Sequence, residues 1–202
     1  MTIVYRVKKG LYVNLTNRCP CACTFCIRQH GSGAYGSDSL WLEREPTVEE
    51  VIAAIDVAVA DGCDELVFCG YGEPTERLDE LLAVARHVRE TCPRLPIRVN
   101  TNGLADLIAG RPTAALFAGL IDAVSVSLNA PTAEEYVKLC RPKFGASAYE
   151  AMLRFAAEAK AHVPSVVMSV VGTEDMTPEK IAACRKICDR IGVPLRVRAY
   201  SN

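Results

Sequence analysis

Short apolar runs alternate with longer amphipathic segments along almost the whole chain, and this order limits the fold more than any other feature. The amphipathic segments place apolar residues at three- and four-residue steps, which is typical of helices with one buried face. The apolar runs have the length and composition of buried strands. Strands that alternate with helices through short connections indicate right-handed βαβ units and a parallel sheet. We predict strands at 11–16, 65–70, 96–100, 123–128, 165–171 and 194–200, and helices near 47–60, 76–92, 104–118, 132–139, 147–163 and 178–191.

The length of the chain helps to decide between a closed barrel and an open one. A closed barrel of eight such units typically takes about 250 residues, whereas this chain has 202 and reaches its last predicted strand at 194–200. We therefore predict an α/β fold, a partial (β/α)6 TIM-like barrel with parallel strands and a lateral opening. No linker or repeat interrupts it, so residues 1–202 are expected to form a single domain.

Composition excludes several classes of partner. The 23 basic and 24 acidic residues give a formal charge of −1 and form no basic run, so we expect no membrane binding and no evident nucleic-acid binding. The chain shows neither a leader pattern nor a long apolar stretch, which predicts a cytoplasmic protein. Thiols stay reduced there, so the ten cysteines favour metal or cluster ligation over a disulfide framework.

Alternation along the strands predicts which side chains face the inside of the barrel. In VSVSLN (124–129) the apolar residues point one way, and Ser127 and Asn129 point the other way with Ser125. Asn14 and Thr16 alternate with apolar neighbours in the same manner. If the apolar sets lie under the helices, these polar sets line a concave, ligand-holding face.

A cysteine-rich loop follows the first predicted strand, in the stretch NLTNRCPCACTFC (14–26). Cys19, Cys23 and Cys26 form a C-x3-C-x2-C series. Three thiolates on one short loop can hold three irons of a [4Fe–4S] cluster and leave the fourth iron open for chemistry. The alternatives are a zinc site or a group of buried thiols, although the three histidines form no zinc-binding pair. Cys21 lies outside the series and is expected to be a small loop residue or a neighbour of the cluster.

The segment CPCACTFC (19–26) resembles the cluster motif of the radical S-adenosylmethionine (SAM) superfamily, with Phe25 at its aromatic position. The resemblance covers nearly the whole chain. It implies a cluster loop over 17–28 and a [4Fe–4S] cluster bound by the three cysteines of the series. In that family SAM chelates the open iron, and an electron cleaves it to methionine and a 5′-deoxyadenosyl radical that abstracts hydrogen from substrate. An electron donor such as flavodoxin or ferredoxin is implied as well.

Further motifs that match the family lie at successive strand ends, where ligands gather in parallel α/β folds. GYGEPT (70–75) resembles the glycine-rich motif whose backbone meets the methionyl amine of SAM, although Tyr71 replaces the more usual glycine. NTNG (100–103) and SLNA (127–130) match positions that hold the ribose and carboxylate, and VVG (170–172) matches the segment against adenine. Each motif could instead be an ordinary turn, cap or core strand. The implied cofactor-binding residues are Phe25, Gly70, Tyr71, Gly72, Glu73, Pro74, Asn102, Ser127, Asn129, Val171 and Arg198.

Other polar and sulfur-bearing residues are given weaker roles. Arg196, Arg198 and Tyr200 share a face of the last strand, where an arginine could reach a carboxylate of SAM or substrate, or could simply blunt a sheet edge. Arg28 and His30 are candidate substrate contacts. The tract 30–47 is long for a plain connection and is predicted to be a lid or substrate loop.

The remaining cysteines are not expected to form a second cluster. Cys184 and Cys188 share a stripe with apolar residues and are predicted to lie in the core. Four others are too dispersed along the chain to form an obvious ligand set: Cys63, Cys69, Cys92 and Cys140.

Several longer stretches resemble the subgroup called TatD-linked radical SAM proteins, among them LWLEREPT, SLNAPTAEEY and LCRPKFG. This likeness implies association with a TatD-type nuclease but no particular reaction. It leaves open hydrogen abstraction from a peptide or protein, and rearrangement of a small heterocycle as in 7-carboxy-7-deazaguanine synthase. A non-catalytic iron–sulfur electron-transfer or zinc-binding protein is a third reading. The sequence identifies no catalytic residue beyond the cofactor set.

Overall fold

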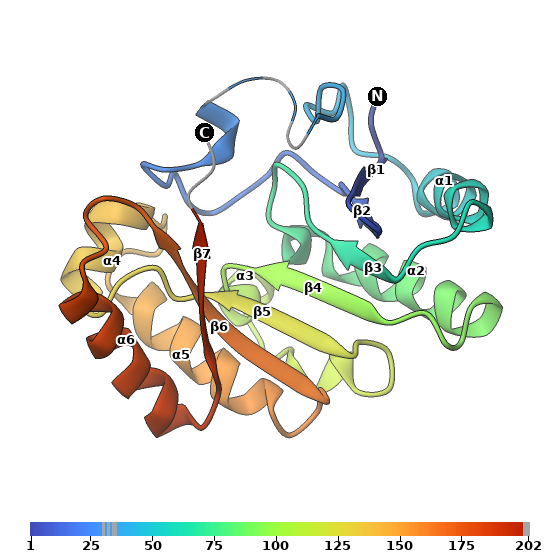
Figure 1. Cartoon of the computed structure of the whole chain (residues 1–202). Coiled ribbons are helices and arrows are strands. Elements are labelled where there is room, and N and C mark those ends of the chain that lie inside the picture. Colours follow the sequence, from blue (N-terminus) through green and yellow to red (C-terminus); the bar gives the residue numbers. More distant parts are fainter. Residues whose placement is uncertain (30, 32, 34–35, 200–202) are drawn as a thin grey trace.

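A seven-stranded, mostly parallel sheet forms the centre of the computed structural model, which describes residues 1–29, 31, 33 and 36–199. The strands lie side by side in chain order, and within the described residues β1 and β7 are the two edges, so the barrel is open (Figure 1). The predicted partial barrel is therefore confirmed. The strands are β1 Val4–Val7, β2 Gly10–Val13, β3 Glu65–Phe68, β4 Ile97–Thr101, β5 Ala123–Ser127, β6 Ser165–Gly172 and β7 Leu195–Ala199.

Helices cover the convex face of this sheet (Figure 1). α1 begins after a reciprocal cap, in which the Thr47 side chain accepts from Glu50 N and the Glu50 carboxylate accepts from Thr47 N. The helices are α1 Val48–Ala60, α2 Leu78–Thr91, α3 Ala105–Ala109, α4 Ala133–Cys140, α5 Ser147–Ala159 and α6 Pro178–Ile191, with 3₁₀ turns η1 Ile27–Gln29, η2 Pro74–Arg77 and η3 Ala114–Phe117. None of the helices described is long and apolar enough to cross a lipid bilayer.

Two elements differ from the prediction. β1 was not predicted, and it pairs antiparallel with β2 through a turn in which Lys8 has a φ of 54°. The turn contains two lysines in place of the glycine or asparagine that marks such hairpins, so the sequence gives no turn signal. The helix predicted over 104–118 is also wrong as a single element. Gly110 ends α3 in the left-handed region, and Pro112 separates it from η3.

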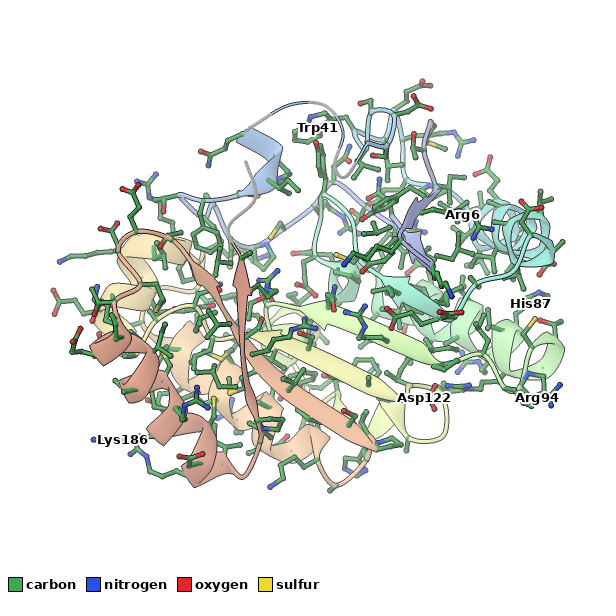
Figure 2. All side chains as sticks on the ribbon, viewed as in Figure 1. Arg6, Trp41, His87, Arg94, Asp122 and Lys186 are labelled. Carbon is green, nitrogen blue, oxygen red and sulfur yellow. The ribbon has the colours of Figure 1, made fainter. Side chains whose placement is uncertain are left out.

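The core lies between the convex face and the helices. Val124, Val126 and Leu128 are fully buried there, as their alternation predicted. Phe117 and Phe155 meet edge to face beneath them, with ring centroids 6.0 Å apart. Burial of each such side chain contributes about 1.5–3 kcal/mol. Charged side chains such as the labelled Arg6, Arg94 and Lys186 lie on the outer surface (Figure 2). Because helices cover the convex face, the concave face and the carboxyl edge are left for ligands.

The turn after β3 packs directly against the segment that follows β2. A Cβ added to Gly70 would lie 2.1 Å from Asn14 Oδ1, and one added to Gly72 would lie 2.2 Å from the carbonyl oxygen of Thr16. Glu73 N donates to the carbonyl of Arg18 at 2.8 Å across the same contact. Only glycine lets the two backbones approach this closely. The contact holds the start of the cysteine loop against the carboxyl end of β3.

This packing predicts that Gly72→Ala destabilises the fold and moves the cysteine loop. The new methyl group meets backbone atoms that cannot turn away, so we expect the free energy of unfolding in urea to fall by about 3 kcal/mol. Gly119→Ala is the matched control, because a Cβ there meets nothing within 4 Å and only the positive φ of 72° opposes it. The free energy of unfolding of Gly119→Ala should fall by only about 1 kcal/mol. Equal losses in the two variants would contradict the packing.

Candidate active site

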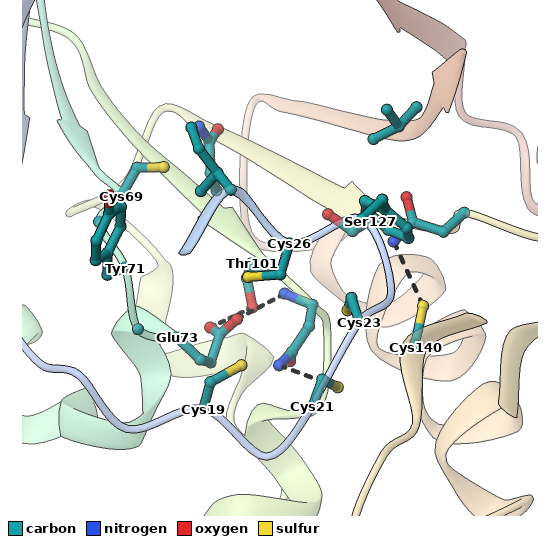
Figure 3. Close-up of a pocket in the computed structure, with 18 of the residues that line it drawn as sticks. Cys19, Cys21, Cys23, Cys26, Cys69, Tyr71, Glu73, Thr101, Ser127 and Cys140 are labelled. Atoms are coloured by element: carbon teal, nitrogen blue, oxygen red, sulfur yellow. Dashed lines mark hydrogen bonds between the residues drawn. The ribbon is translucent and has the colours of Figure 1, made fainter. Parts of the chain in front are cut away.

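A cavity of about 260 Å³ opens at the carboxyl edge of the sheet, where the cysteine loop passes over the strand ends. Figure 3 shows the four cysteines of the loop, with Glu73 on one side and Cys140 on the other. The three cysteines of the series line this cavity together with every predicted cofactor-binding residue except Pro74. Pro74 is instead the buried first residue of η2. The predicted residues that line the cavity are Cys19, Cys23, Cys26, Phe25, Gly70, Tyr71, Gly72, Glu73, Asn102, Ser127, Asn129, Val171 and Arg198.

The cysteine loop is fixed in place by backbone hydrogen bonds to the end of α4. Ala22 N donates to the carbonyl of Cys140 at 3.0 Å, and Thr24 N donates to that of Leu139 at 2.9 Å. Cys21 forms an isolated antiparallel bridge with Pro142. An irregular segment needs such partners because buried backbone groups without hydrogen bonds are costly. These contacts define the path of the loop.

Four thiols that line the cavity shift one another's pKa. Interaction with Cys21 lowers the pKa of Cys19, and interaction with Cys140 and then Cys21 lowers the pKa of Cys23 to about 4. The same interactions raise the pKa of Cys21 and Cys140. Two cysteines of the series therefore lie in surroundings that favour the thiolate, which is the form that binds iron.

Two cysteines that sequence reasoning set aside as too dispersed line the cavity as well. Cys69 lies at the carboxyl end of β3, and Cys140 is the last residue of α4. Their place in the same cavity as the loop depends on tertiary contacts that spacing along the sequence does not reveal. The position of Cys69 at a predicted strand end was the available signal. Cys184 and Cys188 are fully buried in the core, as predicted.

The donor set fits an iron–sulfur cluster better than a single ion. Among the residues that the structure describes, no three Cys, His, Asp or Glu side chains converge closely enough to hold one metal ion. A cubane needs a wider arrangement, because each thiolate binds a different iron atom. The three cysteines of the series lie on one loop, line one cavity and are soft ligands suited to iron and sulfide. The geometry therefore does not favour the zinc alternative.

Glu73 joins the ends of β3 and β4 beneath the loop. Its buried carboxylate accepts from the Thr75 backbone and hydroxyl at 3.1 and 2.8 Å, from the Thr101 hydroxyl at 2.7 Å and from Asn102 N at 2.7 Å. Burial raises the pKa of Glu73, and the four hydrogen bonds oppose that shift. Because its oxygens are already bonded, the side chain holds the cavity wall in shape.

Two polar atoms in the cavity wall are buried without a hydrogen-bond partner among the described residues. Asn129 has a φ of 60° and its amide nitrogen lies 3.6 Å from Cys140 Sγ, but its Oδ1 has no donor. The Nε of Arg198 likewise has no acceptor. Buried polar atoms normally find partners, so these two indicate a ligand with a complementary donor and acceptor.

The segment after residue 30 is tied to the site by many contacts. The Tyr71 hydroxyl shares its proton between the carbonyl oxygens of Gly31 and Gly33, at 3.0 and 3.1 Å, and Trp41 meets its ring edge to face with centroids 5.1 Å apart. Tyr71, which replaces the family's usual glycine, thus fastens the predicted lid to the turn after β3. Leu40 from this segment lines the cavity. The lid role itself stays a prediction, and His30 lies outside the described residues.

Several other predicted contacts take different places. Asn14 and Thr16 do not line the cavity, because their side chains donate to the carbonyl of Leu40 and to Glu45. The expectation that they face the lumen was wrong, since the segment 40–45 covers them. Arg28 donates to the carbonyl of Asn17 and lies over the Trp41 ring, so it does not line the cavity either. Tyr200 lies outside the described residues.

The environment of Glu73 predicts the pH dependence of a Glu73→Gln variant. At pH 5 the free energy of unfolding should fall by about 2 kcal/mol, because an amide NH₂ replaces an acceptor that faces four donors. The folded-state pKa of Glu73 lies above its ordinary value of 4.5. Its contribution to stability is therefore greatest at low pH and is lost as the pH rises through the folded-state pKa. The difference in the free energy of unfolding between wild type and variant, measured in urea, should accordingly become smaller as the pH rises.

The exposed Glu158→Gln on α5 is the matched control for this measurement and should track the wild type at every pH. If the difference in the free energy of unfolding between wild type and Glu73→Gln grew as the pH rose, the raised pKa of Glu73 would be contradicted.

Comparison with known proteins agrees with this geometry. The family described as "Radical SAM superfamily" matches residues 13–188. A GTP 3′,8-cyclase of Corynebacterium glutamicum is 33% identical over 184 residues, covering 86% of this chain and 45% of the relative. One of Streptomyces coelicolor is 33% identical over 139 residues, covering 67% of this chain and 37% of the relative. The chain thus spans less than half the length of these two relatives.

Solved structures share the fold at low sequence identity. Streptococcus suis SuiB bound to its precursor peptide SuiA gives a TM-score of 0.69 at 14% identity, covering 98% of this chain and 40% of SuiB. Methylornithine synthase gives a TM-score of 0.63 at 15% identity, covering 95% of this chain and 53% of the synthase chain. Other neighbours were solved with SAM, or with cobalamin and a [4Fe–4S] cluster. The family match and the arrangement of the cavity together show that the chain belongs to the radical SAM superfamily, whose enzymes use a [4Fe–4S] cluster and SAM.

Proposed function

We propose that this chain holds a [4Fe–4S] cluster through Cys19, Cys23 and Cys26 and cleaves SAM reductively. One observation supports this most strongly: the three thiols share a cavity with polar residues from several parallel strand ends. The bound cofactors would supply a 5′-deoxyadenosyl radical for hydrogen abstraction. The protein itself binds, orients and excludes water.

The cavity wall offers complementary groups for SAM. Asn129 Oδ1 is an acceptor without a donor and suits an amino or hydroxyl group of the ligand. Ser127 and Asn102 line the same wall, at the ends of β5 and β4. Val171 on β6 provides an apolar surface that suits a purine ring. These groups support a placement with the nucleoside and methionyl ends of SAM at the strand ends and the open iron on the loop side.

Reduction of the cluster needs an electron from outside the chain. We propose a small electron-transfer protein such as flavodoxin or ferredoxin as the donor. The cysteine loop lies at the rim of the fold, where such a partner could approach (Figure 1). A cytoplasmic location suits this partner. Association with a TatD-type nuclease rests on motif likeness alone and is the least supported part of the proposal.

The substrate proposal follows the sequence relatives. They are named GTP 3′,8-cyclase and are about one third identical to this chain, which supports a small heterocycle, in particular a purine nucleotide. A peptide or protein substrate is the second candidate, because the barrel is open and SuiB was solved with a peptide. That likeness is at 14% identity and extends to the fold alone. The nucleotide is therefore the better supported of the two.

Anaerobic reconstitution with iron and sulfide, followed by SAM and dithionite, tests this function. The wild type should form 5′-deoxyadenosine and methionine, measured by liquid chromatography and mass spectrometry. Cys19→Ser, Cys23→Ser and Cys26→Ser should each fall to background, because a cluster short of one thiolate is lost or inactive. Cys63→Ser is the matched control, since this half-buried cysteine does not line the cavity. It should keep activity within about twofold of wild type.

Two outcomes would overturn the proposal. A stable cluster without cleavage of SAM would favour a non-catalytic electron carrier. Zinc bound in place of iron after purification and reconstitution would favour the metal-binding alternative.

A further inference from the structure

Three arginines lie on the concave face of the sheet, and one of them, Arg198, lines the cavity. Arg98 is on β4, and Arg196 and Arg198 are on β7. Arg98 Nη1 donates to Asn100 Oδ1 at 2.8 Å, and Asn100 lines the cavity. Arg196 Nη2 donates across the sheet to Ser125 Oγ at 3.1 Å. Both side chains therefore reach inward over the sheet, which is not how a charge that merely blunts an edge strand would lie.

These arginines carry more charge than their surroundings balance. Arg98 forms hydrogen bonds of 2.6 and 3.0 Å with the carboxylate of Glu65. Among the described residues, no carboxylate lies within ion-pair distance of Arg196 or Arg198. The three guanidinium groups thus face one carboxylate, which leaves two positive charges. The Nε of Arg198 is also buried without an acceptor.

The surroundings of Arg196 show that these charges act on one another. Burial lowers the pKa of Arg196 most, and repulsion from Arg98 and Arg198 lowers it further. The opposing groups are Tyr12 and Glu65, which raise it. A concave surface that concentrates like charges this way stabilises a bound anion, because the anion removes the repulsion. Guanidinium groups also match the planar, paired acceptors of phosphates and carboxylates.

We propose that Arg98, Arg196 and Arg198 bind a phosphate group of a small-molecule substrate. Two unbalanced positive charges match a phosphate, which carries about −1.5 to −2 at neutral pH, better than a single carboxylate. Arg98 and Arg196 lie beneath the residues that line the cavity, so a ligand anchored there can extend its organic part toward the cysteine loop. The placement of the ligand's organic part beside the 5′-deoxyadenosyl radical rests on the proposed function, whereas the binding of phosphate by the arginines does not.

Calorimetry on the cluster-loaded full chain, under anaerobic conditions and without SAM, tests this site. The probes are inorganic pyrophosphate, GTP and guanosine. Pyrophosphate and GTP should bind, with affinities that fall as salt rises, and guanosine should bind at least about tenfold more weakly than GTP. Arg196→Gln and Arg198→Gln should each lower the affinity for pyrophosphate about tenfold or more.

The matched control is Arg154→Gln, an exposed arginine on α5 that loses the same charge away from the concave face. It should bind pyrophosphate like the wild type. Arg196→Lys should recover part of the lost affinity, and thermal unfolding confirms that each variant is folded. Equal affinity in wild type and Arg196→Gln, preference for citrate over pyrophosphate, or no phosphate binding by the wild type would each overturn the site.

The same preparation separates this inference from the proposed function. A wild type that cleaves SAM but binds no phosphate would refute the arginine site alone. A wild type that binds pyrophosphate through the arginines but forms no 5′-deoxyadenosine would refute the proposed function alone. A change confined to the KM for SAM in Arg198→Gln, with pyrophosphate affinity retained, would assign Arg198 to the cofactor and contradict its place here.

Discussion

The contact between the glycine turn after β3 and the segment after β2 is the constraint on which the site depends. Neither Gly70 nor Gly72 has room for a Cβ, because Asn14 and the Thr16 carbonyl occupy that space. Asn14 Oδ1 accepts from Tyr71 N across the contact, and its amide donates to the carbonyl of Leu40. One buried asparagine thereby links the start of the cysteine loop, the glycine turn after β3 and the segment 40–45 that covers them.

The chemistry of the site follows from that placement. Parallel strands end at a common edge, so residues far apart in the chain meet there. The loop places three cysteine side chains in the cavity, Glu73 fixes the wall with four hydrogen bonds, and Asn129 Oδ1 is a buried acceptor without a donor among the described residues. Arg198 lines the cavity with the thiols, and Arg98 and Arg196 lie on the same concave face outside the lining. The proposals together divide the lumen into a cluster region, a nucleoside region and an anion-binding region.

Sequence patterns predicted most of the fold because burial imposes them directly. The parallel strands β2 to β6 each carry fully buried apolar residues, and the alternation near 124–129 assigned both faces correctly, whereas β7 is a largely exposed edge strand. The β1 hairpin was not predicted because its turn contains two lysines and no glycine or asparagine. The helix predicted over 104–118 ends early because Gly110 terminates α3 and Pro112 follows, which apolar periodicity does not register. In the site, spacing placed Arg196 and Arg198 on one face of the last strand, but Cys140 and Arg98 could not be found from it. Their proximity depends on tertiary contacts, such as the docking of α4 against the loop.

The central claim is that three thiolates bind the cluster and one iron stays free for SAM. Cys21 and Cys140 are the groups that could refute it, since both line the same cavity as Cys23. The most direct measurement is Mössbauer spectroscopy of the reconstituted protein with and without SAM. We expect one iron of the four to change its isomer shift when SAM binds, in wild type, Cys21→Ser and Cys140→Ser alike. Spectra that SAM leaves unchanged in wild type, but not in one of those variants, would show that a fourth thiolate closes the cluster and would contradict the account.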